Sequence, residues 1–154
     1  MKSYRNKLQL EQLDRKLKLF SNLAASGTPT DGWIHAIRTS LGMSLNQLAK
    51  RMSMTAQSVK ELEQREKNYN VTLKNLAEAA RILNLRLVYG FAPQTDSLTK
   101  QVDRQARRVA EKIVLRTDKT MRLENQGNST PRLKKAINER AEDLKNKQPR
   151  YLWD

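Results

Sequence analysis

The sequence predicts a mainly α-helical fold with one short β-strand, and three observations lead to this prediction. Apolar residues recur every three or four positions over most of the chain, as they do on one face of an α-helix. Ser or Thr precedes several of these segments, where its hydroxyl can accept a hydrogen bond from an unpaired helix amide. The period changes to alternation only in residues 85–93. We therefore expect a helical domain with an N-terminal helical arm and a C-terminal helical extension.

The first segment, residues 1–30, is expected to form an amphipathic helical arm and a linker. Its apolar stripe consists of Leu10, Leu13, Leu17 and Phe20. The stripe must be buried on the central domain or on a partner subunit, and the sequence leaves both open. Turn-forming residues follow the arm, and Thr30 or Asp31 is expected to cap the helix that begins near Trp33.

Residues 31–65 predict two short helices that are joined by a tight turn and share one small core. Ser44 and Thr55 each precede one of the helices and are expected to cap it. The residues expected in the shared core are Leu45, Leu48, Ala49, Met52, Val59 and Leu62. The second helix then presents a slim, polar outer face, which suits the major groove of DNA. The alternative is a pair of amphipathic helices in an ordinary bundle.

The same stretch resembles the Xre/Cro-type helix-turn-helix family. The residues that carry the resemblance are Ser44, Gln47, Leu48, Ala49, Met52, Thr55, Val59, Leu62 and Glu63. Two positions differ, because Leu45 stands where the family commonly has Gln and Ser53 where it has Gly in the turn. The second difference requires Ser53 or Met54 to adopt the strained turn geometry.

Operator DNA is the expected partner of this motif, and two groups of residues are candidates for contacts. Gln57, Ser58 and Lys60 are expected at or near base edges, and Ala56 is expected to face outward and to meet a thymine methyl group. Phosphates are expected at the amides that start each helix and at Ser44, Gln47, Lys50 and Thr55.

The domain is expected to continue through a third capped helix into a strand, so that it spans residues 31–93. Thr72 is expected to cap this helix, which supplies Leu73, Leu76, Ala80 and Leu83 to the core. Residues 85–93 are expected to form a strand that pairs with a second subunit or another protein, because a lone strand leaves its backbone unpaired. The alternative is an extended loop on the core. A paired strand would suit a homodimer on a palindromic operator.

Two further segments complete the chain. Residues 94–126 are expected to form a basic helix, whose apolar side carries Leu98, Val102, Ala106, Val109 and Ile113. Residues 127–154 form a charged tail that is either a short helix or disordered, and its terminal Tyr151, Leu152 and Trp153 are expected to be exposed.

Composition limits the classes of function. The chain has 154 residues, a formal net charge of +14 and a pI near 10.3, which favours a polyanionic partner such as nucleic acid. It has no cysteine and one histidine, His35, which is expected at the surface or on a phosphate. We therefore expect no enzyme, no metal and no cofactor. Without a signal peptide or a long apolar run, the expected location is the cytoplasm and no membrane is involved.

A second resemblance covers roughly residues 10–126 and narrows the function. The segments QLDRKL, GWIHAIRTSLGMS, VTLKNLAEAA, LRLVYGFAP and TMRLENQ together resemble the family called mobile mystery protein A. Its members are typically encoded beside a Fic-domain protein, mobile mystery protein B. The resemblance therefore implies a toxin-antitoxin type of pair with a Fic-domain partner.

Antitoxins of Fic adenylyltransferases resemble one another in an inhibitory helix with Ser or Thr, three residues, Glu, and then Gly or Asn. Thr120, Glu124 and Asn125 match this pattern, and the first two lie one helical turn apart. In that family the glutamate pairs with an arginine that would otherwise hold the γ-phosphate of ATP. The resemblance implies an antitoxin and autorepressor; the alternatives are a stand-alone repressor and an architectural DNA binder of low specificity.

Overall fold

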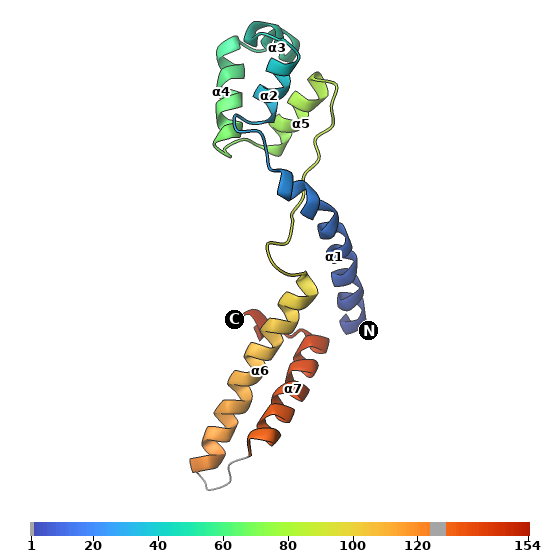
Figure 1. Cartoon of the computed structure of the whole chain (residues 1–154), viewed down its shortest axis with the longest axis vertical. Coiled ribbons are helices and arrows are strands. Elements are labelled where there is room, and N and C mark those ends of the chain that lie inside the picture. The colour runs from blue at the N-terminus through green and yellow to red at the C-terminus, as the bar shows by residue number, and fades with distance from the viewer. Residues whose placement is uncertain (1, 124–128) are drawn as a thin grey trace. The chain divides into compact units, whose positions relative to one another are not determined.

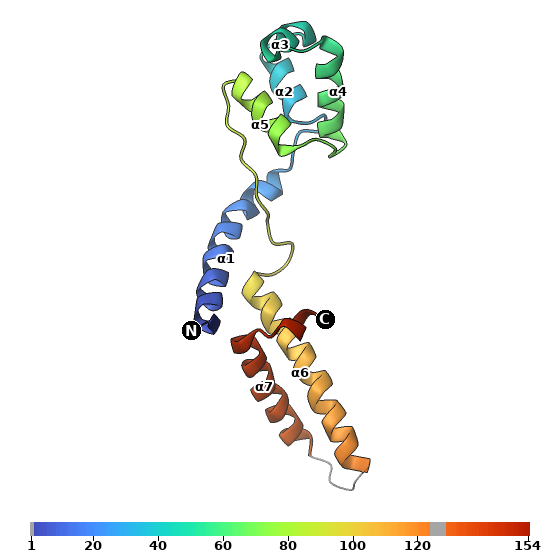
Figure 2. The same cartoon turned by 180° about the vertical axis from the view of Figure 1, so that it is seen from behind.

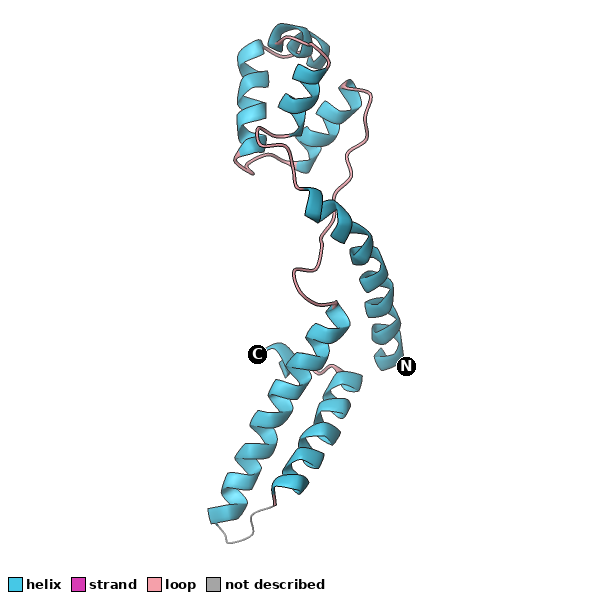
Figure 3. Ribbon diagram, in the orientation of Figure 1, coloured by secondary structure: helices cyan, strands magenta, loops and turns pink. Residues whose placement is uncertain are grey.

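The computed structural model describes residues 2–123 and 129–154 and, within them, contains helices joined by loops (Figure 3). The helices follow the chain as shown in Figure 1. Their bounds are α1 Lys2–Ser26, α2 Trp33–Ser40, α3 Leu45–Met52, α4 Ala56–Lys67, α5 Leu73–Ile82, α6 Leu98–Leu123, α7 Thr130–Lys147 and a 3₁₀ turn, η1, Arg150–Trp153. The mainly helical prediction is confirmed.

The chain divides into two compact units. The central unit is Leu23–Gly90, and the terminal unit combines Met1–Asn22 with Phe91–Asp154. The division falls within α1 and within the loop that follows α5. Each unit has its own cluster of buried apolar residues.

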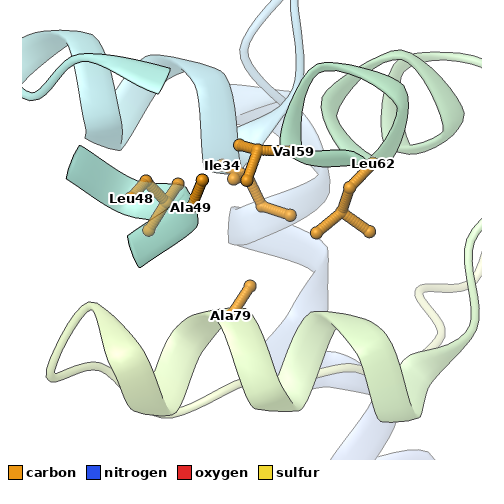
Figure 4. Packing of buried hydrophobic residues seen from close by; sticks show 6 residues of the cluster. All are labelled: Ile34, Leu48, Ala49, Val59, Leu62 and Ala79. Carbon is orange, nitrogen blue, oxygen red and sulfur yellow. The ribbon is translucent and has the colours of Figure 1, made fainter. Parts of the chain in front are cut away.

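Helices α2 to α5 of the central unit surround a small core (Figure 4). Its buried members are Ile34, Leu48, Ala49, Val59, Leu62 and Ala79. The positions expected in α3 and α4 are confirmed, with Leu45 and Met52 partly buried against this cluster. Of the positions expected from the third helix, Leu76 and Leu83 pack against the cluster as predicted. Ala79 is fully buried in place of Ala80, which is only partly buried, and Leu73 is about half exposed.

The strand expected in residues 85–93 is not confirmed. Within the described residues there is no strand, and this segment is a loop. Asn84 ends the helical stretch with φ at 58°, and the amide of Leu85 donates to the carbonyl of Ala80. The backbone of the segment finds no neighbouring strand to pair with, and Val88 and Tyr89 are exposed.

In the terminal unit, α6 and α7 lie side by side in both views (Figures 1 and 2). Small side chains allow the close approach, since Ala106 and Ala110 of α6 are buried together with Leu144 of α7. Leu152 of η1 is buried in the same cluster. From Thr130 onward the charged tail is therefore mainly helical and is anchored by Leu144 and Leu152. Of its last three expected exposed residues, Tyr151 and Trp153 are exposed and Leu152 is buried.

The N-terminal arm is helical as predicted, and part of its apolar stripe is buried within the same chain. Leu10 packs against the buried cluster of the terminal unit, whereas Leu13 is about half exposed. Asp14 also faces α6: its carboxylate accepts hydrogen bonds from the amides of Leu98 and Thr99 at 2.7 and 3.1 Å. The arm thus caps the start of α6.

Candidate nucleic-acid interface

Helix α3 begins with a complete capping box, which fixes two of the residues expected to contact phosphate. The Ser44 hydroxyl accepts from the Gln47 amide at 3.2 Å, and Gln47 Oε1 accepts from the Ser44 amide at 2.7 Å. Because Oε1 is occupied in this way, the exposed Nε2 group of Gln47 is left to donate outward. The start of α3 is therefore rigid and carries hydrogen-bond donors.

The turn between α3 and α4 has the geometry that the sequence required. Ser53 adopts the left-handed conformation, with φ at 55° and ψ at 43°. The amides of Met54 and Ser53 donate to the carbonyls of Ala49 and Lys50, which is the Schellman pattern of helix termination. Serine thus occupies a position that usually favours glycine.

Helix α4 begins at Thr55, as predicted. The Thr55 hydroxyl accepts from the Ser58 amide at 3.1 Å and lies 2.8 Å from the Ser58 hydroxyl. Both hydroxyls are therefore engaged at the helix start, and Ser58 is half-buried. One expectation is wrong: Ala56 does not face freely outward, because it is partly buried and packs against the core.

The remaining candidates lie on exposed surface. Gln57 is exposed on α4, where its Nε2 donates to Glu61 Oε1 at a long 3.3 Å. Lys50 and Lys60 are exposed and form no ion pair within the part of the chain that the structure describes. The exposed side chains offer amide and ammonium donors, which is the chemistry that base edges and phosphates accept.

A buried ion pair, which the sequence reasoning missed, holds α2 against α4. Arg38 donates through Nε and Nη2 to the two carboxylate oxygens of Glu63, and both residues are buried. His35 Nδ1 lies 2.9 Å from Glu63 Oε2, so the tautomer that donates from Nδ1 fits the site. His35 is thus partly buried against a carboxylate, not free on the surface as expected.

The electrostatics of this cluster favour the charged carboxylate. Burial alone would raise the pKa of Glu63, but hydrogen bonds from Arg38 and His35 outweigh burial and hold the pKa below its ordinary value. The guanidinium also donates through Nη1 to the carbonyl of Met43, next to the start of α3. One arginine therefore joins α2, α4 and the loop that leads into α3.

Helix α2 is capped from a distance, and the expected cap by Thr30 or Asp31 is wrong. The Glu66 carboxylate accepts from the amides of Trp33 and Ile34, both at 2.9 Å. Gly32 precedes the helix with φ at 87°, and a Cβ there would lie 3.1 Å from Glu66. Asp31 instead pairs with Lys67 at 2.7 Å.

The residues expected to inhibit a partner enzyme are described only in part. Thr120 is exposed in α6, and its hydroxyl donates to the carbonyl of Arg116 at 3.1 Å. Glu124 and Asn125 lie outside the described residues.

Among residues 2–123 and 129–154, no cluster of three or more His, Asp or Glu side chains could hold a metal ion. In the same ranges, no helix is long and apolar enough to cross a bilayer.

Comparison with known proteins agrees with the geometry of the central unit. Residues 34–89 match a family model described as helix-turn-helix, HTH_3, which is the Xre type. No curated protein and no solved structure matched the chain. The match indicates a DNA-binding regulator, and domains of this kind are typically not enzymes.

Proposed function

We propose, from the premise that residues 34–89 form a helix-turn-helix domain, that this protein is a transcriptional repressor that reads operator DNA with α4. The observation that carries the proposal is the exposed polar face of α4 beside two rigidly capped helix starts. An α-helix fits the major groove, where each base pair presents a distinct pattern of donors and acceptors.

The two groups of residues have different roles in this proposal. Gln57 and Lys60 contact base edges or their immediate surroundings, because they lie on the exposed side of α4. Ser44, Gln47 and Lys50, with the amides at the starts of α3 and α4, hold phosphates and fix the orientation. Thr55 and Ser58 contribute by fixing the start of α4, because the Thr55 hydroxyl accepts from the Ser58 amide and lies 2.8 Å from the Ser58 hydroxyl.

Two copies of the chain bind together in this proposal. A dimeric helix-turn-helix protein reads two half-sites about 34–36 Å apart, so the expected operator is a palindrome.

The test is selection of bound duplexes from a randomised library, followed by affinity measurements on the selected site. Gln57→Ala should cost about 1–3 kcal/mol of binding and relax the preference at one base position. Lys50→Ala should weaken binding to all sequences alike. Lys67→Ala is the control, because Lys67 is an exposed lysine at the far end of the same helix. A selected site that Gln57→Ala binds with unchanged preference would contradict the assigned role of α4.

A second role is proposed for the end of α6, where the sequence Thr120-Met-Arg-Leu-Glu124-Asn125 matches the inhibitory pattern of Fic antitoxins. In this proposal Glu124 pairs with the arginine of a Fic adenylyltransferase that would otherwise bind the γ-phosphate, and Thr120 enters the same pocket. The support is the motif together with the resemblance to mobile mystery protein A. The protein would then be an antitoxin that also represses its own operon.

Co-expression with the product of the adjacent gene, which the resemblance implies is a Fic-domain protein, tests this role. Glu124→Gly should restore adenylylation, whereas Glu139→Gly, the same change at an exposed position of α7, should not. If no association forms, or if both variants behave as the wild type does, the protein is a stand-alone repressor.

A further inference from the structure

The excess of positive charge is concentrated outside the helix-turn-helix unit. The terminal unit contains 21 Lys and Arg against 11 Asp and Glu, a net charge of +10, whereas the central unit carries the remaining +4 of the total of +14. A unit with this excess attracts polyanions, and the proposed function of the central unit does not use it.

Part of this excess follows one side of α6. The opposite side of the helix is buried, since Val102, Ala106 and Ala110 pack in the cluster with α7 and η1. Arg108, Lys112 and Lys119 are all exposed, and their spacings of four and seven residues place them on one face of the helix. We call these three residues the basic stripe.

The charges of the basic stripe are not neutralised by the described part of the protein. Several other cations of α6 have carboxylate partners, since Arg104 pairs with Asp96 at 2.8 Å and Arg122 with Asp118 at 2.8 Å. Arg116, which is exposed beside the basic stripe, has no ion pair within the described residues either. Arg107 lies 3.5 Å from Glu111. The basic stripe has no ion pair within the described residues. Three unpaired cations on one face need counterions or an anionic partner.

We propose that the basic stripe is a second DNA-contact surface that binds the phosphate backbone without regard to sequence. Arg108 and Lys119 are 11 residues apart, which is about 17 Å along the helix. One DNA strand presents a phosphate about every 3.4 Å of axis, so three cations over this length can each find one.

A duplex fits the basic stripe better than an acidic protein does. Protein interfaces depend on buried aromatic or apolar anchors. The face of the basic stripe offers one, Leu115, which is 51% exposed. The inference rests on the proposed function, since both units would bind the same duplex. The basic stripe would add affinity, and the central unit would add sequence preference.

The test compares the full chain with the triple variant Arg108→Gln, Lys112→Gln, Lys119→Gln by fluorescence anisotropy. The probes are a 30-base-pair duplex of random sequence and the duplex selected from the randomised library, titrated from low to high salt. Each phosphate contact contributes about −0.9 to the slope of log K against log salt, so the variant should lose about 2.7 of that slope on both probes. Its preference for the selected duplex should be unchanged.

The control is the triple variant Arg132→Gln, Lys134→Gln, Lys135→Gln, which removes the same charge from exposed positions of α7. It should keep the slope of the wild type. Lys112→Gln alone should remove about 0.9 of the slope and replaces the triple variant if that variant unfolds.

Equal losses of slope in both triple variants would overturn the inference, and so would an unchanged slope in the stripe variant. The basic stripe would then bind an acidic protein or face solvent. A loss confined to the stripe variant, without any preference for the selected duplex in the wild type, would instead overturn the proposed function alone. A wild type that binds neither duplex would contradict both proposals.

Discussion

The two units of the molecule start their helices in different ways. In the central unit, α3, α4 and α5 each begin at a neighbouring hydroxyl, from Ser44, Thr55 and Thr72. In the terminal unit, α6 begins at the Ser97 hydroxyl, which accepts from the Lys100 amide at 3.3 Å, and also at the Asp14 carboxylate, which lies 84 residues away from Leu98 in the sequence. The starts of α3, α4 and α5 thus have local caps, whereas the start of α6 combines a local cap with a carboxylate from the arm. The one central helix without a local cap, α2, depends on Glu66 and the Arg38–Glu63 pair.

The largest expected effect comes from the buried pair that fixes α2. Arg38→Met would leave Glu63 buried without its guanidinium, and the central unit should lose about 3–5 kcal/mol of its free energy of unfolding. Urea denaturation followed by circular dichroism measures the loss. Lys67→Met removes an exposed partner of Asp31 and should have a far smaller effect. Similar losses in the two variants would show that the buried pair does not hold α2 in place.

The next effect tests the remote cap of α6. Asp14→Asn should destabilise the terminal unit by about 0.5–2 kcal/mol, since the carboxylate caps the helix start. Glu11→Gln is the matched control, because Glu11 is exposed on the same helix. Thermal denaturation of both variants measures the difference. An equal response would contradict the capping role.

The same cap should be sensitive to acid. Burial alone would raise the pKa of Asp14, but hydrogen bonds from Thr99 and from the Leu98 amide outweigh it and lower the pKa. The stability that Asp14 contributes is therefore complete above its unfolded-state pKa of about 3.9 and is lost as pH falls through the lower folded-state value. Unfolding measured from pH 7 downward should show the wild type losing its advantage over Asp14→Asn below about pH 4. A constant difference at all pH values would contradict this account.

The smallest expected effect concerns the turn between α3 and α4. Ser53→Gly should stabilise the central unit by about 0.5–1 kcal/mol, because glycine adopts the left-handed conformation without the cost of a side chain. The comparison variant is Ala77→Gly, at an exposed position inside α5, where glycine should be destabilising by a similar amount. The melting temperature of each variant, compared with that of the wild type, measures both changes. A loss of stability in Ser53→Gly would show that the serine side chain supports the turn.

The features predicted correctly from sequence were those that depend on near neighbours. Hydroxyl caps at Ser44 and Thr55 follow from residues within one turn, as do the buried positions of Leu48 and Val59. The cap of α2 could not be predicted in this way. Glu66 accepts from the amides of Trp33 and Ile34, which lie 33 and 32 residues before it in the sequence. The strand expected in residues 85–93 depends on a pairing partner, which a local pattern does not supply.

The terminal unit shows the same limit. Its last segment was expected to be either a short helix or disordered, with Leu152 exposed. Leu144 and Leu152 are instead almost completely buried, because they pack against Ala106 and Ala110 of α6. In the candidate site, the sequence alone led us to expect Ala56 on the outer face, and packing against the core removed it from that face. The proposed contacts of Gln57, Lys50 and the other exposed residues with DNA stay predictions.

The most direct test of the central claim, that α4 reads sequence, is one affinity ratio measured across salt concentrations. The ratio compares the selected duplex with random duplex in the wild type, in Gln57→Ala and in the triple variant of the basic stripe. We predict that Gln57→Ala lowers the ratio at unchanged salt slope, and that the stripe variant lowers the slope at unchanged ratio. A ratio that Gln57→Ala leaves intact would contradict the account, because sequence would then be read elsewhere in the molecule.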